Sequence, residues 1–144
     1  MKTMLLAALM LAFAPLTAFA QQPAPTGVWL YPNKRFEVEI VPCGDQLCGT
    51  IAWLKSPETA QGAPRVDCFN ADPALRTRPL LGLVVLQGLH QIDDHTWDGG
   101  TIYNPDDGSH YSATVSIADD GTLHVHAYVL LAMLGKTIVF TRVS

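Results

Sequence analysis

Polar and apolar residues alternate with a period of two through much of the chain after residue 26. The alternation is clearest over residues 35–40 and 111–117, and it is typical of β-strands that bury one face. Residues 80–86 are continuously apolar instead, which predicts a more deeply buried strand. Short strands at regular spacing favour an all-β sandwich or barrel. The predicted strands are residues 27–31, 34–42, 47–54, 80–87, 95–103, 109–118, 122–129 and 136–143.

The register of the first hairpin is predicted from two cysteines. Residues paired across a sheet share a face, so a correct register must bring apolar residues together. Placing Cys43 opposite Cys48 meets this requirement and puts both cysteines on the outer face. The residues on the predicted inward face are then Phe36, Val38, Ile40, Ile51 and Trp53, with Val38 opposite Trp53.

Two further hairpins follow from turn residues. A loop of sequence Pro-Asp-Asp-Gly is expected to pair Asn104 with Ser109. A loop of sequence Asp-Asp-Gly fits a type I turn followed by a left-handed glycine, and it pairs Ala118 with Thr122. Both registers place apolar residues on a common inward face.

Trp97 points outward if its strand is regular, which would leave a large aromatic ring in solvent. The pair Gly99-Gly100 follows it closely, and glycine is a natural residue for a β-bulge. We therefore predict a bulge at these glycines that returns Trp97 to the interior.

Residues 55–79 interrupt the succession of strands with a long loop that contains four prolines. Within it, Asp72 followed by Pro73 is typical of an N-cap and the first position of a helix, and predicts one helical turn. Loops of this length in a small domain are usually functional lids or disordered segments. We expect the part from Asp67 onward to be ordered.

Residues 1–20 have the features of a secretory signal peptide. Lys2 precedes an apolar stretch over residues 4–11, and a small-x-small site ends at Ala20. We expect cleavage near Ala20 and a periplasmic or secreted protein. Residues 21–26 are then a flexible lead-in, and residues 27–144 form one barrel domain.

Charge and composition exclude several classes of protein. The net charge is −4, and removal of Lys2 with the signal peptide leaves 8 basic and 13 acidic residues, or −5. A mildly acidic chain with scattered basic residues argues against nucleic-acid binding. No apolar run after the signal peptide reaches the length of a membrane span, and about 124 residues suit a single domain.

Three cysteines in an exported protein allow three disulfide pairings or none. The register above favours a bridge between Cys43 and Cys48. Cys68 then remains, either as a buried apolar residue or as the site of an intermolecular bridge in a homodimer. The spacing of the cysteines matches no common zinc pattern.

No catalytic or metal-binding constellation emerges from the sequence, and we expect neither enzyme activity nor a cofactor. His124 and His126 share a strand face, but their predicted neighbours are hydroxyls, which suit a solvated surface. The paired aspartates sit at turns, where aspartate side chains bond nearby amides. Neither a Gly-x-Ser-x-Gly sequence nor a phosphate-binding glycine loop is present.

Several motifs resemble known families. Gly27-x-Trp29 resembles the opening signature of lipocalin-like barrels, and Arg142 resembles the arginine that packs over that tryptophan and closes the barrel. A more extensive resemblance is to an exported bacterial family, domain of unknown function 2147. Its motifs occur here in order, as Cys43-x4-Cys48-Gly49, Ile51-x-Trp53-Leu54, Asp67-x-x-Asn70-x-Asp72-Pro73-x-Leu75-Arg76-x-Arg78-Pro79-Leu80, Gly82-Leu83, Trp97-x-Gly99-Gly100-x-Ile102-Tyr103, Pro105-x-x-Gly108-x-x-Tyr111, Leu134-Gly135 and Thr141-Arg142-Val143.

The resemblance implies a lipocalin-like antiparallel barrel. Together with the strands and turns predicted above, this gives a single eight-stranded antiparallel up-and-down (lipocalin-like) barrel with one long ordered loop and a short helical turn. The family has no established biochemical role, so the functional hypothesis rests on the barrel. An eight-stranded barrel either fills its interior with side chains or holds one small ligand. We expect it to bind a small apolar or amphipathic molecule, or alternatively to be a filled cell-envelope structural or interaction module.

The candidate ligand-binding residues come from two parts of the chain. Inward aromatic side chains would supply contact area, and polar side chains of the long loop would hold a polar end. Inward Gly49, Gly100 and Ala113 are small and would leave space. The candidates are Trp29, Trp53, Trp97, Tyr111 and Phe140 in the strands and Asn70, Arg76 and Arg78 in the loop.

Overall fold

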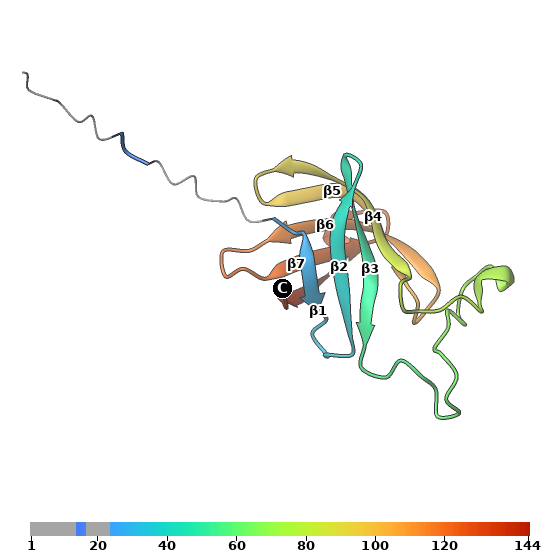
Figure 1. The fold of residues 1–144 in the computed structure, drawn as a ribbon. Coiled ribbons are helices and arrows are strands. Elements are labelled where there is room, and N and C mark those ends of the chain that lie inside the picture. Colours follow the sequence, from blue (N-terminus) through green and yellow to red (C-terminus); the bar gives the residue numbers. More distant parts are fainter. Residues whose placement is uncertain (1–13, 17–23) are drawn as a thin grey trace, which may run out of the picture.

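The computed structural model describes residues 14–16 and 24–144. The predicted signal peptide, apart from residues 14–16, and residues 21–23 of the predicted lead-in lie outside the described residues. Within the described chain, eight strands form a closed antiparallel barrel in which each strand pairs with the next and β8 pairs with β1 (Figure 1). The elements are β1 (Gly27–Leu30), β2 (Phe36–Cys43), β3 (Gln46–Leu54), η1 (Pro73–Leu75), β4 (Val84–Asp93), β5 (Thr96–Asn104), β6 (Ser109–Ile117), β7 (Leu123–Tyr128), η2 (Ala132–Leu134) and β8 (Lys136–Arg142). The predicted up-and-down barrel is confirmed.

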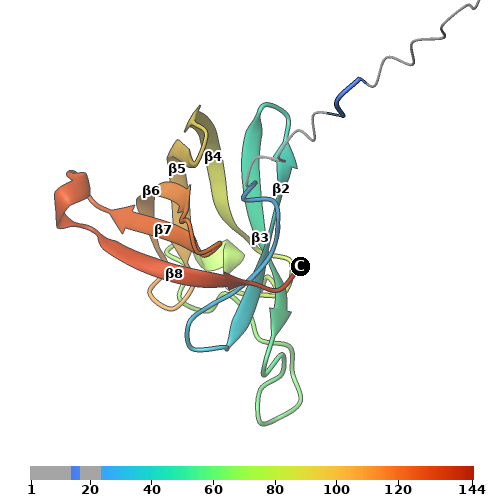
Figure 2. The same ribbon diagram turned by 90° about the vertical axis from the view of Figure 1, so that its left-hand side faces the viewer.

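The up-and-down order divides the connections between the two ends of the barrel. We call the end with the β1–β2, β3–β4, β5–β6 and β7–β8 connections the open end, and the other the closed end. The closed end carries the short β2–β3, β4–β5 and β6–β7 turns, and the first two lie at the top of Figure 2. One-sided alternation in the strands directs apolar side chains into the barrel. The buried apolar residues are Trp29, Val38, Ile40, Ile51, Leu83, Val85, Leu86, Leu89, Trp97, Tyr103, Ala113, Val115, Ile117, Leu123, Val125 and Phe140.

The fourth strand lies further along the chain than its apolar run predicts. The sequence predicts residues 80–87, whereas β4 runs over Val84–Asp93. The amide of Leu83 donates to the carbonyl of Leu80 in a turn where Gly82 has a φ of +85°, so the start of the run belongs to the long loop. The strand then continues through Gly88, whose φ of +77° is accessible to glycine without strain.

The register of the β2–β3 hairpin differs by two residues from the predicted one. Cys43 pairs with Gln46 and Val41 pairs with Cys48, because the turn contains only two residues instead of four. A shift of two residues leaves inward and outward faces unchanged. The inward placement of Ile40 is therefore correct although its predicted partner is wrong.

Trp53 is the exception, and its predicted inward position is wrong. A register shift at the boundary between Glu37 and Val38 pairs Trp53 with Glu37 and pairs Val38 with Ile51. The extra residue in β3 reverses the side-chain direction beyond it. Trp53 is consequently 43% exposed on the outer face, and Leu54 points inward in its place.

The other local predictions are confirmed. Asn104 pairs with Ser109, and the amide of Ala118 bonds the carbonyl of Thr122. The register between β5 and β6 shifts between Trp97 and Gly100, so the predicted bulge exists and the indole is buried. The predicted helical turn is η1, whose N-cap Asp72 accepts a hydrogen bond from the amide of Ala74.

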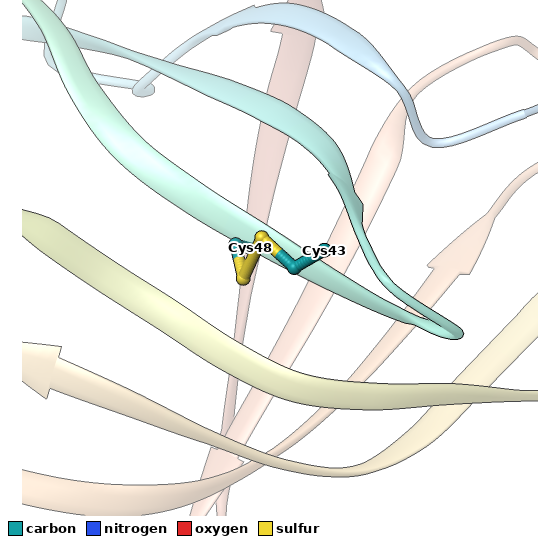
Figure 3. The surroundings of a disulfide bond; sticks show 2 residues. All are labelled: Cys43 and Cys48. Atoms are coloured by element: carbon teal, nitrogen blue, oxygen red, sulfur yellow. A yellow bond between two sulfur atoms is a disulfide. The ribbon is translucent and has the colours of Figure 1, made fainter.

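A disulfide joins Cys43 and Cys48 at the closed end, as predicted (Figure 3). It connects diagonal positions of the β2–β3 hairpin, with the two Cα atoms 5.8 Å apart. Cys68 is exposed and is the free cysteine of the described residues, so of the two alternatives for it, the buried apolar residue is wrong. It lies in the long loop, outside the barrel wall.

Replacing both Cys43 and Cys48 with serine is expected to lower the free energy of unfolding by about 2 kcal/mol, because the bridge restricts a short loop of the unfolded chain. Urea denaturation under non-reducing conditions measures this. The matched control, Cys68→Ser, removes an exposed thiol and should leave the free energy unchanged. Equal stability of the double variant and wild type would contradict the prediction.

The closed end is completed by residues just before β1. Trp29 is fully buried, and its indole N–H donates to the carbonyl of Pro25 at 2.7 Å. The guanidinium of Arg142 lies 4.2 Å above the indole ring and donates to the carbonyls of Ala24 and Thr26. Residues 24–26 of the predicted lead-in are therefore attached to the barrel and are not a free segment.

Candidate functional site

The open half of the barrel contains a cavity of about 500 Å³. Volumes of this size are typical of small-molecule sites. Its lining includes residues of three open-end connections, among them Tyr31, Ser56 and Pro105, together with Lys136 at the start of β8. The cavity thus extends from the middle of the barrel to its open end. The apolar and aromatic lining residues are Tyr31, Phe36, Val38, Ile51, Leu54, Leu80, Val85, Ile102, Tyr103, Tyr111, Ala127, Ile138 and Phe140.

Three aromatic rings form one wall of the cavity. Tyr31 stacks on Phe36 with ring centroids 4.5 Å apart, and the edge of Phe140 approaches Tyr31 at 5.4 Å. The rings come from the β1–β2 connection, β2 and β8, which are neighbours around the barrel. Mutual packing of this kind holds the side chains in place before any ligand arrives.

The empty space does not arise where small inward residues predict it. Gly49 lies against Val38 and Leu86, and Gly100 lies so close to Leu89 that an added Cβ would be 2.6 Å from that side chain. Larger neighbours therefore fill the space beside these glycines. The cavity lies nearer the open end, where the small residue Ala127 is part of its lining.

The rim of the cavity is cationic. Arg35, Lys55, Arg65 and Lys136 line it, and Asp106 is the acidic residue among the lining residues, which gives 4 − 1 = +3. The contact between Arg35 and Asp106 is 4.0 Å long and largely exposed, so it neutralises little charge. The rim therefore presents positive charge beside an apolar interior.

Below the rim, a buried carboxylate fastens the long loop to β5. Asp67 is fully buried and accepts hydrogen bonds from the hydroxyl of Tyr103 at 2.6 Å and the amide of Asn70 at 2.8 Å. Arg78 makes a salt bridge to it at 2.9 Å, and Arg76 donates to the carbonyl of Asn70. Among the described residues, no buried side-chain nitrogen or oxygen atom of this cluster lacks a hydrogen-bond partner.

Opposing effects act on the pKa of Asp67. Burial alone raises this pKa, but hydrogen bonds from Tyr103, Asn70 and Arg78, together with the charge of Arg78, more than offset burial. The pKa of Asp67 is therefore lowered. Burial and the neighbouring carboxylate raise the pKa of Tyr103. The cluster is therefore a charged anchor that holds the long loop on β5.

Only some of the residues predicted to bind a ligand line the cavity. Tyr111 and Phe140 line it. Tyr111 donates its hydroxyl to Asp107 at 2.6 Å, a bond that raises the pKa of Tyr111 and lowers that of Asp107. Trp29 and Trp97 are buried away from the cavity.

The loop residues predicted to hold a polar end do not line the cavity. Asn70, Arg76 and Arg78 are bound within the Asp67 cluster instead. Their carbonyl and carboxylate partners belong to the loop itself, which must satisfy its polar groups without strands. The positive groups that face the cavity are those of the rim.

The rim cations were missed because they are scattered through the sequence and belong to no motif. A signal was available in the topology, since alternate connections of an up-and-down barrel meet at one end. Arg35, Lys55 and Lys136 each stand next to such a connection. Arg65 lies inside the long loop, and only tertiary structure places it at the mouth.

Other candidates contribute no site. His124 bonds Thr122 and His126 bonds Thr137, consistent with a polar outer face. Among the residues whose placement is described, no group of three or more His, Cys, Asp or Glu side chains could hold a metal ion. The same residues include no helix long and apolar enough to span a bilayer.

Comparison with known proteins identifies the family. A family model described as "uncharacterized protein conserved in bacteria (DUF2147)" matches residues 27–142. The chain belongs to the DUF2147 family. The match runs from the first residue of β1 to the last residue of β8, and so covers the whole barrel. The resemblance seen in the sequence motifs is confirmed.

A solved structure supports the same fold. This DUF2147 chain is similar to the protein HP1028 from the human pathogen Helicobacter pylori, which is described as belonging to the lipocalin family. The TM-score is 0.71 at 23% sequence identity, over 88% of this chain and 85% of that one. The likeness shows a lipocalin-like fold. No curated protein matches the chain.

Proposed function

We propose that this DUF2147 protein is an exported barrel that binds one small amphipathic molecule. The observation that carries the proposal is an aromatic, mostly apolar cavity of about 500 Å³ whose rim is cationic. A ligand with an apolar body and an anionic end matches both parts. The signal peptide predicted from residues 1–20 supports export to the periplasm or medium.

The chemistry of the rim favours an anionic end over a neutral one. Lys55, Arg65 and Lys136 surround the mouth without a carboxylate partner among the described salt bridges. The side chain of Arg65 is oriented by donating to the carbonyl of Ser56 at 2.7 Å. A carboxylate or sulfonate at the mouth would gain charge-assisted hydrogen bonds there. The alternative of a filled barrel requires a solid interior, which the open half lacks.

Filling the cavity is expected to weaken ligand binding strongly. The probe is 1-anilinonaphthalene-8-sulfonate, an aromatic anion whose fluorescence rises in apolar sites. Ala127→Phe places a ring in the cavity and should weaken probe binding at least tenfold, on the order expected when a site loses its volume. The matched control is Ala52→Phe, which adds the same ring to an exposed position of β3. Equal affinity of Ala127→Phe and wild type would overturn the proposal.

A second measurement tests the charge of the ligand. Decanoate should displace the probe more strongly than decanol, and Arg65→Gln should remove up to about fivefold of that preference. Equal displacement by the two compounds would contradict the assignment of an anionic end.

The natural ligand can be identified by native mass spectrometry of protein purified from its own host. The expected result is a bound mass in the range of a small amphiphile.

A further inference from the structure

Five aliphatic side chains stand exposed at the tip of the β7–β8 hairpin. The tip comprises residues 129–134, and residues 128–135 contain no charged side chain. Exposed apolar residues are ordinary when scattered, but a contiguous group marks an interaction surface. The exposed fractions are 55% for Val129, 90% for Leu130, 56% for Leu131, 85% for Met133 and 70% for Leu134.

The backbone of the tip explains why these side chains point away from the barrel. Leu130 adopts a φ of +66°, which turns the chain sharply after β7. The short helix η2 follows, and His126 contacts the carbonyl of Ala132 and so holds it against the strand. Gly135 approaches the carbonyl of Ala127 so closely that an added Cβ would be 2.5 Å away. The hairpin closes on itself, and its five aliphatic side chains do not line the cavity.

The tip projects at the open end. The β7–β8 connection belongs to the same end as the β1–β2 and β3–β4 connections. Figure 2 shows the red tip reaching beyond the barrel at the left, with the blue β1–β2 connection and the green long loop below, while the β2–β3 and β4–β5 turns lie at the top. Lys136 lies two residues after the tip and lines the cavity.

Charge is divided between the two ends of the barrel. Of nine Lys and Arg residues, Lys2 belongs to the predicted signal peptide, and seven of the remaining eight lie in or beside the open-end connections. These connections also carry five acidic residues (Glu58, Asp67, Asp72, Asp106 and Asp107), so their net charge is 7 − 5 = +2. The closed end carries five aspartates and Arg142, or −4. The open-end cations are Lys34, Arg35, Lys55, Arg65, Arg76, Arg78 and Lys136, and the closed-end aspartates are Asp45, Asp93, Asp94, Asp119 and Asp120.

We propose that the open end docks on a lipid bilayer that carries anionic headgroups. The apolar tip inserts among the acyl chains near the headgroups, and the surrounding cations contact the lipid phosphates. The charge division orients the barrel, because the acidic closed end is repelled from the same surface. The docking surface stands without the proposed ligand, but it would place the cavity mouth against the membrane.

A bilayer fits the tip better than a second copy of the chain. Pairing two tips would bring Lys136 and the other rim cations of both copies together. One hairpin tip is also small compared with the 1,200 Å² or so that stable protein interfaces bury. The tip contains neither aromatic residues nor arginine, the side chains that dominate the energetics of protein interfaces.

Vesicle flotation tests the proposal with protein purified as its host produces it. The protein should float with vesicles of phosphatidylcholine and phosphatidylglycerol, less with phosphatidylcholine alone, and less at high salt. The double variant Leu130→Ser/Met133→Ser should lower partitioning at least tenfold, since inserted apolar area drives such binding. Lys136→Gln should lower it about fivefold. The matched control is Ile92→Ser, at 62% exposure beside the closed end.

Three results would overturn the proposal. They are absence of binding to the mixed vesicles, equal binding by the tip variant and wild type, and a tip-dependent dimer in light scattering, which would make the tip a protein interface. The tip variant should bind 1-anilinonaphthalene-8-sulfonate with unchanged affinity. Failure of docking is therefore distinguishable from failure of the ligand proposal.

Discussion

Replacing Trp29 with alanine is expected to lower the free energy of unfolding by about 4 kcal/mol, as for other buried aromatic side chains. The indole is fully buried beneath the guanidinium of Arg142, and its N–H satisfies the carbonyl of Pro25. Truncation leaves a cavity at the closed end and an unpaired carbonyl. Such a loss is a large part of the stability of a small domain.

Chemical denaturation of Trp29→Ala measures the effect. The matched control is Trp53→Ala, in which the same residue type is removed from a 43% exposed position and should cost less than about 1 kcal/mol. Arg142→Ala should destabilise less than Trp29→Ala and leave probe affinity similar, because the closed end is separate from the cavity. If Trp29→Ala and Trp53→Ala lowered the free energy of unfolding by similar amounts, the closed end would not be the main source of the barrel's stability.

Replacing Asp67 with asparagine is expected to cost about 3 kcal/mol at neutral pH, because the buried carboxylate loses its charge-assisted hydrogen bonds from Tyr103, Asn70 and Arg78. The folded-state pKa of Asp67 lies below its ordinary value of 3.8. Its contribution to stability is therefore complete at neutral pH and is lost as the pH falls below about 3.8, through the folded-state pKa. The difference between wild type and Asp67→Asn should shrink in the same range.

Melting temperatures of both proteins across the acid range check this expectation. Asp94→Asn, at an exposed turn of the closed end, provides the control and should not reproduce the effect. A stability difference that stays constant into strong acid would contradict the role of the carboxylate charge. Asp67→Asn should also weaken probe binding, because the loop it fastens carries Arg65 and Leu80 to the cavity.

These two predictions separate the ends of the barrel. The closed end holds the fully buried Trp29 together with Arg142 and the disulfide, and its loss should reduce stability first. The open end holds the cavity, the cationic rim and the apolar tip, and changes there should alter binding first. Asp67 should affect both stability and binding, because it fastens the long loop, and residues of that loop line the cavity mouth.

Local features were predictable where few residues decide them. The hairpin from Asn104 to Ser109 and the bulge after Trp97 depend on turn residues and adjacent glycines, which are visible in the sequence. The N-cap Asp72 is equally local. The predicted register of β2–β3 is wrong because it places the two cysteines directly opposite each other, whereas a disulfide also spans a diagonal pair.

Side-chain roles that depend on distant segments were not predictable. Trp53 points outward because one extra residue in β3 reverses its parity, and no turn signal marks that position. Arg78 was predicted to hold the polar end of a ligand, but it binds Asp67, 11 positions away in sequence. The buried carboxylate of Asp67 requires a positive partner, and only the folded loop shows which arginine provides it.

The sequence by itself determined the all-β class, the eight strands and the inward face of most of them, because alternation and turn chemistry act between neighbouring residues. It also determined the disulfide partners and the family. Tertiary structure alone decided that the open half is hollow and that its rim is cationic. Whether a cavity remains depends on the volumes of inward side chains from all eight strands together. Connections far apart in sequence meet at one end only when the barrel closes.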